Sequence, residues 1–376
     1  MKIVIAPDSF KESLTAQQVC LAIETGFKRV FPNAQYIAIP VADGGEGTVQ
    51  SLVDATGGKI VKLSVTGPLG KPVDAFYGLL ADQQTAVIEM AAASGLDHVP
   101  SALRDPKKTT SYGTGELIKA ALDSGVKKLI IGLGGSATND GGIGMLSALG
   151  ARFIDNQGND VSLNGAGLQQ IQQIDISALD KRLLHCEIFI ACDVDNPLCG
   201  PQGASAIFGP QKGASNEDIA LLDDGLLHYS QMIQETFSLD LKDRSGMGAA
   251  GGMAIAFAAF TNANMQTGIT LVLETVKLAD HLTGADLVIT GEGRIDAQTV
   301  HGKTPMGVAQ AAKKLNLPVI AIAGCLGEKH QAVYRCGIDA VFAATPQAMS
   351  LQEAFDKAAE NVANVAENIA RMWSLK

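Results

Sequence analysis

The chain has 376 residues, a formal net charge of −10, 47% apolar residues and 18% charged residues. This length exceeds the size at which a single hydrophobic core stops growing, so we expect two domains. The acidic balance, without any basic cluster that carries interleaved aromatic residues, argues against a nucleic-acid surface.

Export and membrane insertion are also disfavoured by the sequence. No segment approaches the uninterrupted apolar length of a transmembrane helix, and the first apolar run, at 3–7, is too short for a signal peptide. The six cysteines show no C-x-x-C spacing, which indicates reduced thiols. We therefore predict a cytoplasmic protein that does not contact a membrane.

The first segment alternates strands with helices. A stripe of apolar residues at helical spacing follows the first strand, and Ser13 or Thr15 is the expected N-cap of that helix. Two strand–loop–helix units in succession predict parallel strands joined by crossovers. The predicted elements are a strand at 2–7, a helix at 14–30, a strand at 36–41 and a helix at 49–55.

The order and spacing of the predicted elements change at about residue 59. Closely spaced strands separated by turn signals predict antiparallel hairpins, and this change marks a domain boundary. The predicted elements of the middle segment are strands at 59–65, 73–80, 85–90, 128–132 and 187–192, and helices at 114–122, 216–237, 253–260 and 269–278.

From residue 286 the strand–loop–helix alternation returns. A strand at 287–290 leads into a Gly-x-Gly loop, and Pro305 opens the next helix, where its missing N–H costs least. The remaining predicted elements are a helix at 306–315, strands at 319–323 and 340–343, and helices at 328–336 and 351–372. The last helix is expected to pack on the sheet through Leu351, Phe355, Ala359, Val362, Val365 and Ile369. The simplest topology places residues 1–58 and 285–376 in one parallel-sheet domain, with 59–284 as an inserted mixed α/β domain.

Five loops combine acids with hydroxyl or amide groups, and all but the first contain glycine. Glycine-rich loops expose N–H groups that can bind phosphate oxygens, whereas carboxylates beside a phosphate require a bridging cation such as Mg²⁺. Lys11, Lys212 and Lys303 supply positive charge for a phosphoryl group or a carboxylate. The combination predicts phosphoryl transfer from a magnesium nucleotide. The loops lie at 8–11, 43–48, 134–142, 193–204 and 291–303.

Each loop also has a structural interpretation. Asp8 and Asp43 could simply cap helices, and Lys303 could be a solvated side chain. Asp193 and Asp195 resemble a metal-binding pair, but an acid at an Asn-Pro turn is commonly structural. Five such loops at the ends of strands favour a shared site more than any one of them does.

The motifs, in this order and spacing, closely resemble those of the class I bacterial glycerate kinases over nearly the whole chain. The stretches that carry the resemblance are APDSFKESL (6–14), ADGGEGT (42–48), EMAAASGL (89–96), TTSYGTGELI (109–118), GGSATNDGG (134–142), ACDVDNPL (191–198), FGPQKGAS (208–215), GAAGGMA (248–254) and TGEGRIDAQTVHGKTPMGVA (290–309). The resemblance implies ATP-dependent phosphorylation of D-glycerate to 2-phosphoglycerate. It also implies two α/β domains, one flavodoxin/Rossmann-like and one resembling a restriction-endonuclease core.

The roles of individual residues are inferred from their chemistry and not from the family. Asp193 is the first choice for the base that orients the attacking hydroxyl, and Asp8 is the second. The carboxylate of glycerate is assigned to Ser9 and Lys11. The remaining expectations are Asp43, Glu292 and Asp296 at the substrate, Lys303 in catalysis, Gly134, Gly135, Ser136, Thr138 and Asn139 at the ATP phosphates, and Asp140 with Asp193 at Mg²⁺.

Two rival functions are consistent with parts of the sequence. A non-catalytic two-domain protein could close on a carboxylate ligand, with its acids serving only as caps. A nicotinamide-dependent dehydrogenase is disfavoured, because Pro7-Asp8-Ser9-Phe10 stands where a Gly-x-Gly-x-x-Gly loop would follow the first strand. The oligomeric state and the hydroxyl that is phosphorylated are left open by the residues alone.

Overall fold

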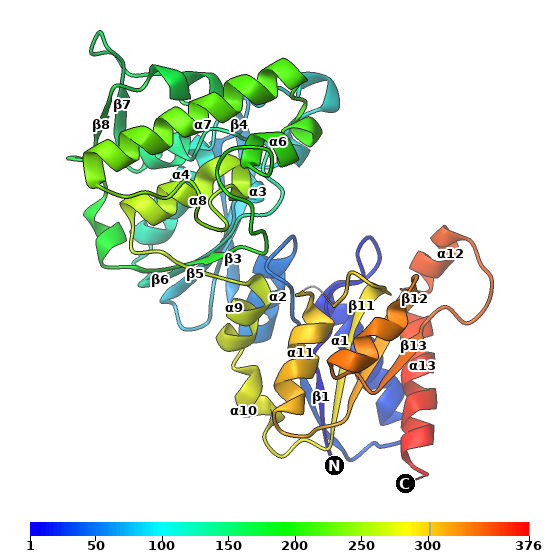
Figure 1. Cartoon of the computed structure of the whole chain (residues 1–376). Coiled ribbons are helices and arrows are strands. Elements are labelled where there is room, and N and C mark those ends of the chain that lie inside the picture. The colour runs from blue at the N-terminus through cyan, green and yellow to red at the C-terminus, as the bar shows by residue number, and fades with distance from the viewer. Residues whose placement is uncertain (301, 376) are drawn as a thin grey trace. The chain divides into compact units, whose positions relative to one another are not determined.

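The computed structural model describes residues 1–300 and 302–375 and divides into two compact units (Figure 1). Unit 1 combines Met1–Gly58 with Thr267–Lys376, and unit 2 is the continuous segment Lys59–Gln266. The outer segments of the chain therefore complete one unit, as the sequence predicts. Each unit is built around its own sheet.

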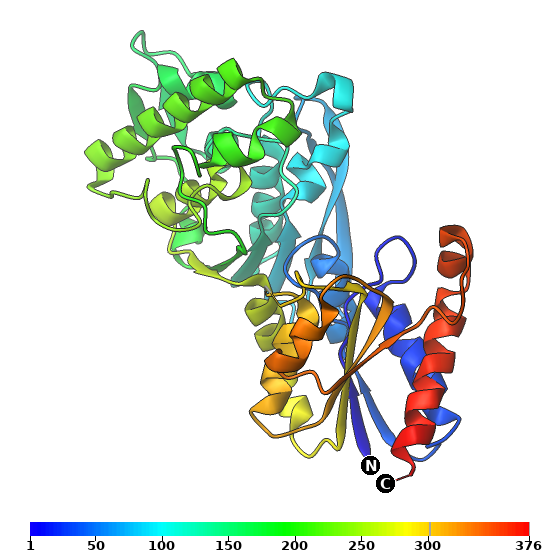
Figure 2. The ribbon, with the colours of Figure 1, turned by 45° about the vertical axis from the view of Figure 1, so that its right-hand side comes forward.

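Unit 1 contains a five-stranded sheet in which every pairing is parallel, in the order β13-β12-β11-β1-β2. Helices α1 (Ala16–Lys28) and α13 (Ala358–Trp373) lie side by side on one face, and α11 (Thr304–Lys313) lies on the other (Figures 1 and 2). The strands are β1 (Lys2–Ile5), β2 (Gln35–Ala38), β11 (Leu287–Ile295), β12 (Val319–Leu326) and β13 (Ala340–Ala343).

The first helix shows why this segment folds as it does. The Thr15 hydroxyl accepts from the Gln18 N–H, and the Gln18 side chain accepts from the Thr15 N–H, a capping box that fixes the start of the helix. Thr15, and not Ser13, is thus the N-cap. The apolar stripe of helix α1, in which Val19, Ile23 and Phe27 are fully buried, packs against the sheet.

Strand β11 runs through the Gly291-Glu292-Gly293 segment, which the sequence analysis treated as a loop. Its pairing with β12 continues to Ile295, opposite Leu326. A Cβ at Gly291 would lie 2.1 Å from the Ile322 carbonyl oxygen, so the glycine permits close approach of two strands and not a turn.

The closing helix predicted at 351–372 is two helices. The short α12 (Leu351–Asp356) ends at Lys357, and α13 follows. The break shifts the helical phase of α12, so Leu351 is exposed while Val362 and Ile369 are buried; Ala359, in the first turn of α13, is exposed as well. The predicted stripe was wrong at its N-terminal end for this reason.

Residues 267–284 belong to unit 1, whereas the sequence analysis placed them in the inserted domain. They form α9 (Gly268–Thr275) and α10 (Leu278–Leu282), which contact α11. Gly268 lies against the Asp43 carbonyl oxygen, which a Cβ would approach to 2.0 Å. A helical pattern alone does not tell which sheet a helix covers, which is why the boundary was misplaced.

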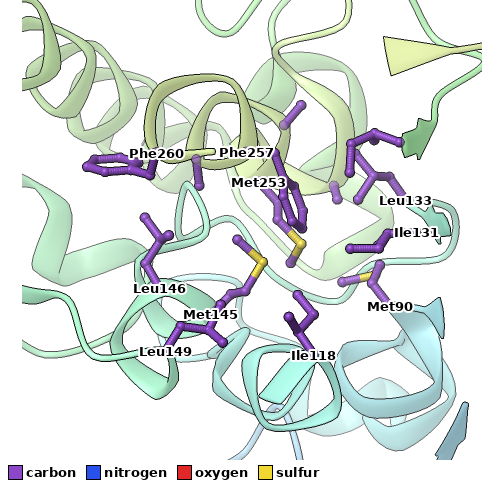
Figure 3. Close-up of a cluster of buried hydrophobic side chains, with 14 of the residues drawn as sticks. Met90, Ile118, Ile131, Leu133, Met145, Leu146, Leu149, Met253, Phe257 and Phe260 are labelled. Carbon is purple, nitrogen blue, oxygen red and sulfur yellow. The ribbon is translucent and has the colours of Figure 1, made fainter. Parts of the chain in front are cut away.

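Unit 2 contains a mixed six-stranded sheet in the order β10-β9-β6-β5-β4-β3. The predicted hairpins are antiparallel pairs of β3 with β4 and of β4 with β5, and the other pairings are parallel. Its core brings Met90, Ile131, Met145, Met253 and Phe257 together from the sheet and its helices (Figure 3). The strands are β3 (Lys59–Thr66), β4 (Pro72–Leu79), β5 (Thr85–Glu89), β6 (Lys128–Gly132), β9 (Glu187–Ala191) and β10 (Asn264–Gln266).

The other regular elements include several short ones that the sequence pattern did not predict. The described residues contain no helix that is both long and apolar enough to span a bilayer. The remaining elements are the helices α2 (Thr48–Thr56), α3 (Ala91–Ser94), α4 (Tyr112–Asp123), α5 (Ile143–Ala148), α6 (Ala204–Phe208), α7 (Asn216–Phe237) and α8 (Ala249–Phe260), the strands β7 (Arg152–Ile154) and β8 (Gln173–Asp175), and 3₁₀ turns that include His330–Cys336.

Candidate functional site

Unit 1 contains a cavity of about 550 Å³ at the carboxyl ends of β1 and β11. From β1 the chain order runs to β2 on one side of the sheet and to β11, β12 and β13 on the other. Such a change of direction leaves a crevice beside the strand ends, where open parallel sheets bind ligands. The cavity is lined by Asp8, Ser9, Lys11, Asp43, Glu292 and Lys303, which the sequence analysis selected from three separate loops.

Asp8 follows β1 and is held in one orientation. Its Oδ1 accepts from the Ser9 N–H at 2.6 Å, and its Oδ2 accepts from the Thr304 hydroxyl at 2.7 Å. Burial raises the pKa of this carboxyl from 3.8 to about 6, opposed by the hydrogen bond from Thr304 and reinforced by the charges of Asp43 and Glu292. Asp8 is thus an oriented acid with a pKa near neutrality.

Glu292 and Lys303 form the opposite part of the polar wall. The Glu292 Oε1 accepts from the Thr299 hydroxyl at 2.6 Å, and its Oε2 lies 3.2 Å from the Lys303 Nζ. Burial raises the pKa of Glu292, while the Thr299 hydrogen bond and the Lys303 charge lower it. Lys303 is one-third exposed and is the N-cap residue of α11, so its ammonium group and the start of a helix both lie at this wall.

Asp43 lies in the loop before α2 and is partly exposed. Its Oδ1 accepts from the Gly45 N–H at 3.1 Å, so it closes its own turn, whereas the N-cap of α2 is Gly47 and not Asp43. It also lines the cavity, and its negative charge contributes to the raised pKa of both Asp8 and Glu292. The polar end of the cavity therefore brings three carboxyl groups together with Lys11 and Lys303.

The other end of the cavity is apolar. It is formed by α12 and the first turns of α13, which contribute Leu351, Phe355 and Val362. Asn361 lies among them with 7% of its surface exposed. Its side-chain amide has no hydrogen bond to any other residue of the described chain, whereas its backbone N–H donates to the Lys357 carbonyl oxygen at 2.9 Å.

The 134–142 loop lies in unit 2, and most of its polar side chains point into the interior. Ser136, Thr138, Asn139 and Asp140 are buried, whereas Gly134 and Gly135 are exposed. The Asn139 Nδ2 donates to the Ser205 hydroxyl at 3.1 Å. None of these residues lines the unit 1 cavity.

Asp140 is completely enclosed. Its Oδ2 accepts from the Ser111 N–H at 2.8 Å and from the Ser111 hydroxyl at 2.7 Å, and its Oδ1 accepts from the Gly142 N–H. Burial raises its pKa despite these hydrogen bonds. The carboxylate organises the loop internally, and its expected place at Mg²⁺ stays a prediction.

Lys212 is also buried. Its Nζ donates to the Ser136 hydroxyl at 2.8 Å and to the Thr138 carbonyl at 2.7 Å, and burial lowers its pKa to about 7 although the charge of Asp140 acts in the other direction. It therefore ties the 134–142 loop to the rest of unit 2 and offers no cation to solvent.

We expect Lys212→Ala to lower the free energy of unfolding by about 3 kcal/mol, because it opens a cavity and leaves two buried acceptors without a donor. Urea denaturation would measure this loss. Lys212→Met, which keeps the volume but not the donor, should lose less. An alanine variant as stable as the parent would show that the lysine does not anchor the loop.

Two further predicted residues do not line the cavity. Asp193 is an exposed residue of unit 2 after β9. Asp296 follows β11, where its Oδ1 accepts from the Gln298 N–H and its Oδ2 pairs with the Arg294 Nε at 3.2 Å. Asp296 thus shapes the turn that carries Thr299.

Thr304, Phe355 and Asn361 were not predicted from the sequence as residues of the site. Thr304 follows Lys303 directly, but its partner Asp8 lies 296 residues away, so only the fold shows the contact. Asn361 could have been noticed as the one amide within the apolar stripe of a helix, a position where an unpartnered polar group is costly.

Comparison with known proteins gives full-length matches. The model of the glycerate kinase family matches residues 3–374. The glycerate kinase of Bacillus subtilis is 56% identical over 370 residues, covering 98% of this chain and 97% of that protein, and the glycerate 2-kinase of Escherichia coli is 54% identical with the same coverage. A crystal structure from Salmonella typhimurium LT2, provisionally named glycerate kinase 2, superposes with a TM-score of 0.93 at 55% identity, covering 100% of this chain and 98% of that one.

Proposed function

The chain belongs to the glycerate kinase family, and we propose that it phosphorylates D-glycerate with ATP to give 2-phosphoglycerate and ADP. The structural observation that carries the proposal is the polar end of the unit 1 cavity. There an oriented acid, Asp8, shares a cavity wall with Lys303 at the start of a helix. Phosphoryl transfer needs a group that orients the nucleophile and positive charge for the transferred group.

In the proposed reaction the glycerate hydroxyl oxygen attacks the γ-phosphorus of ATP. The new P–O bond forms as the bond to the bridging oxygen of ADP breaks, and the hydroxyl proton passes to an oxygen of Asp8. The pKa of about 6 keeps Asp8 ionised at neutral pH while leaving it basic enough to accept this proton. Thr304 fixes the direction of the carboxylate by its hydrogen bond.

The other residues of the cavity have matching roles in the proposal. Lys303 and the first turn of α11 face the transferred phosphoryl group, and Glu292 holds the lysine in place. Ser9 and Lys11 bind the carboxylate of glycerate. The sequence-based choice of Asp193 as base is the alternative that mutagenesis can separate from Asp8.

The residues present fit a magnesium ion bound together with the nucleotide. Within the described part of the chain no three His, Cys, Asp or Glu side chains are placed to hold a metal by themselves. Mg²⁺ does not need such a cluster, because it binds through one or two carboxylates plus substrate phosphates. Asp43, whose charge raises the pKa of two neighbouring acids, would hold it. The ion would neutralise phosphate charge that these carboxylates repel.

The function is tested by incubating the protein with D-glycerate, ATP and Mg²⁺. We expect ADP release that depends on glycerate, and a product whose phosphate is on the 2-hydroxyl by ³¹P NMR. Glycerate-independent ADP release, or none, would contradict the assignment.

Metal dependence gives a separate prediction. Chelation of divalent cations should suppress the activity, and Mg²⁺ or Mn²⁺ should restore it, because the carboxylates of the cavity repel an uncompensated polyphosphate. Steady-state rates before and after EDTA treatment measure this. Undiminished turnover in metal-free buffer would exclude the cation from the mechanism.

We further propose a flavodoxin/Rossmann type for unit 1 and a restriction-endonuclease-like type for unit 2. Read from the other edge, the sheet order of unit 1 is that of the flavodoxin-like folds.

The absence of disulfides among the six cysteines is consistent with a cytoplasmic enzyme. Gly134 and Gly135 stay predicted phosphate contacts of unit 2.

A further inference from the structure

The cavity of unit 1 is larger than a small hydroxy acid requires. Its volume is about 550 Å³, whereas a water molecule accounts for about 30 Å³ of liquid. Glycerate, with the bulk of a few water molecules, fills only a fraction of this space. The polar end accounts for the acid and the phosphoryl group, so the apolar end is available to another part of the reacting molecules.

The apolar end contains two features that match a nucleobase. Phe355, on α12, offers an aromatic surface against which a base can stack. Asn361, on the first turn of α13, offers an amide that is 7% exposed and has no hydrogen-bond partner among the described residues. Buried amides are normally paired, so the missing partner points to a ligand.

A side-chain amide can pair with the hydrogen-bonding edge of a base. It presents one acceptor and two donors, so its oxygen can accept from the exocyclic amino group of adenine while its nitrogen donates to a ring nitrogen. Guanine presents an acceptor where adenine has the amino group, and a ring N–H where adenine has an acceptor. An asparagine side chain can turn to match either edge, whereas an aspartate in its place only accepts, so it would pair with the two adjacent donors of guanine and not with the ring nitrogen of adenine.

We infer that the apolar end of this cavity is the adenine-binding subsite of the enzyme, with Asn361 pairing with the edge of the base and Phe355 packing against it. The inference rests on the proposed kinase function for its choice of ligand. It places the base in unit 1, at the carboxyl ends of β12 and β13, in the same cavity as Asp8 and Lys303.

The test measures ADP binding to the full chain by isothermal titration calorimetry, with no turnover required. Asn361→Asp should weaken ADP binding by about tenfold to a hundredfold and strengthen GDP binding relative to ADP, since a bidentate base contact discriminates by that much. Asn368→Asp, an equal charge change on the exposed face of the same helix, should leave both affinities unchanged.

A second variant separates a loss of ADP binding from misfolding of the protein. Asn361→Leu removes an unpartnered buried amide, so its melting temperature should be equal to or above that of the parent while ADP binding weakens at least tenfold. ADP affinity that is unchanged in both Asn361 variants, or no ADP binding by the parent, would overturn the inference. If ADP binds as expected but glycerate is not phosphorylated, the subsite stands and the proposed substrate fails.

Discussion

Asp8→Asn is expected to lower kcat about a thousandfold and, at the same time, to make the protein more stable. The loss of rate follows from the proposed role, because an amide cannot accept the proton of the attacking hydroxyl, and general-base contributions are of this order. The KM for glycerate should change little, since the amide keeps the size of the side chain. Steady-state kinetics with both substrates varied would measure the split.

The gain in stability follows from the pKa of Asp8. The folded-state value of about 6 is higher than the ordinary value of 3.8, so the folded protein binds the proton more tightly. Ionisation of Asp8 therefore costs stability above pH 6, and this cost vanishes as the pH falls below about 4. Asparagine removes the cost, and after allowing for a weaker hydrogen bond from Thr304 we expect a gain of about 1 kcal/mol at pH 8. Urea denaturation at pH 8 and pH 4 should show the gain only at the higher value.

Asp193→Asn is the matched variant for this experiment. It makes the same chemical change at an exposed position of unit 2. If kcat falls strongly in Asp193→Asn but not in Asp8→Asn, then Asp193, and not Asp8, is the base.

Lys303→Ala is expected to lower kcat about a hundredfold with little change in the KM for glycerate. An interaction that strengthens only as charge develops on the transferred group affects kcat and not ground-state binding, and the loss of one such contact costs about 3 kcal/mol of barrier. Rapid-quench measurement of a single turnover would place the loss in the chemical step.

The ion pair with Glu292 requires a control, because removing the lysine leaves a buried carboxylate unpaired. The double variant Lys303→Ala with Glu292→Gln removes that defect. If its kcat recovered to the parent level, the lysine would act only by neutralising Glu292. An unchanged kcat with a raised KM in the single variant would make Lys303 a ground-state binder.

The polar half of the candidate site could be predicted from the sequence because Asp8 follows β1 and Glu292 lies in the C-terminal half of β11. Asp8 and Glu292 lie where parallel strands place ligand-binding groups, and Lys303 lies at the start of the next helix. The contact between Asp8 and Thr304 could not be predicted, since it depends on the pairing of β1 with β11.

The 134–142 loop shows why composition alone misleads. Its glycines suggested a phosphate cradle, but several serve close packing within unit 2. A Cβ at Gly141 would lie 2.8 Å from the Tyr229 ring, and one at Gly251 would lie 2.0 Å from the Thr138 carbonyl oxygen. Glycine, acid and hydroxyl groups occur both in ligand loops and in crowded interior turns, and only burial distinguishes them.

The apolar half was missed for the opposite reason. Phe355 was assigned to the core stripe of a long helix, and the amide of Asn361 beside that stripe was not singled out. The break at Lys357 turns α12 away from the phase of α13, so that side chains expected to cover the sheet line a cavity instead.

The discontinuity of unit 1 has a consequence for how the chain is made. Strand β1 pairs with β2 on one side and with β11 on the other, and Ile3 lies opposite Leu287. On a ribosome that adds about 5 to 20 residues per second, β1 is synthesised roughly 15 to 60 s before its second partner, β11. Unit 2 is continuous and can fold within that interval. In the nascent chain unit 2 can therefore be folded while the apolar strand β1 (Lys2–Ile5) still has an unpaired edge. An unpaired strand edge can pair with a strand of another chain. Slowing translation after unit 2 has emerged should therefore increase aggregation of the nascent protein more than slowing it before unit 2 begins.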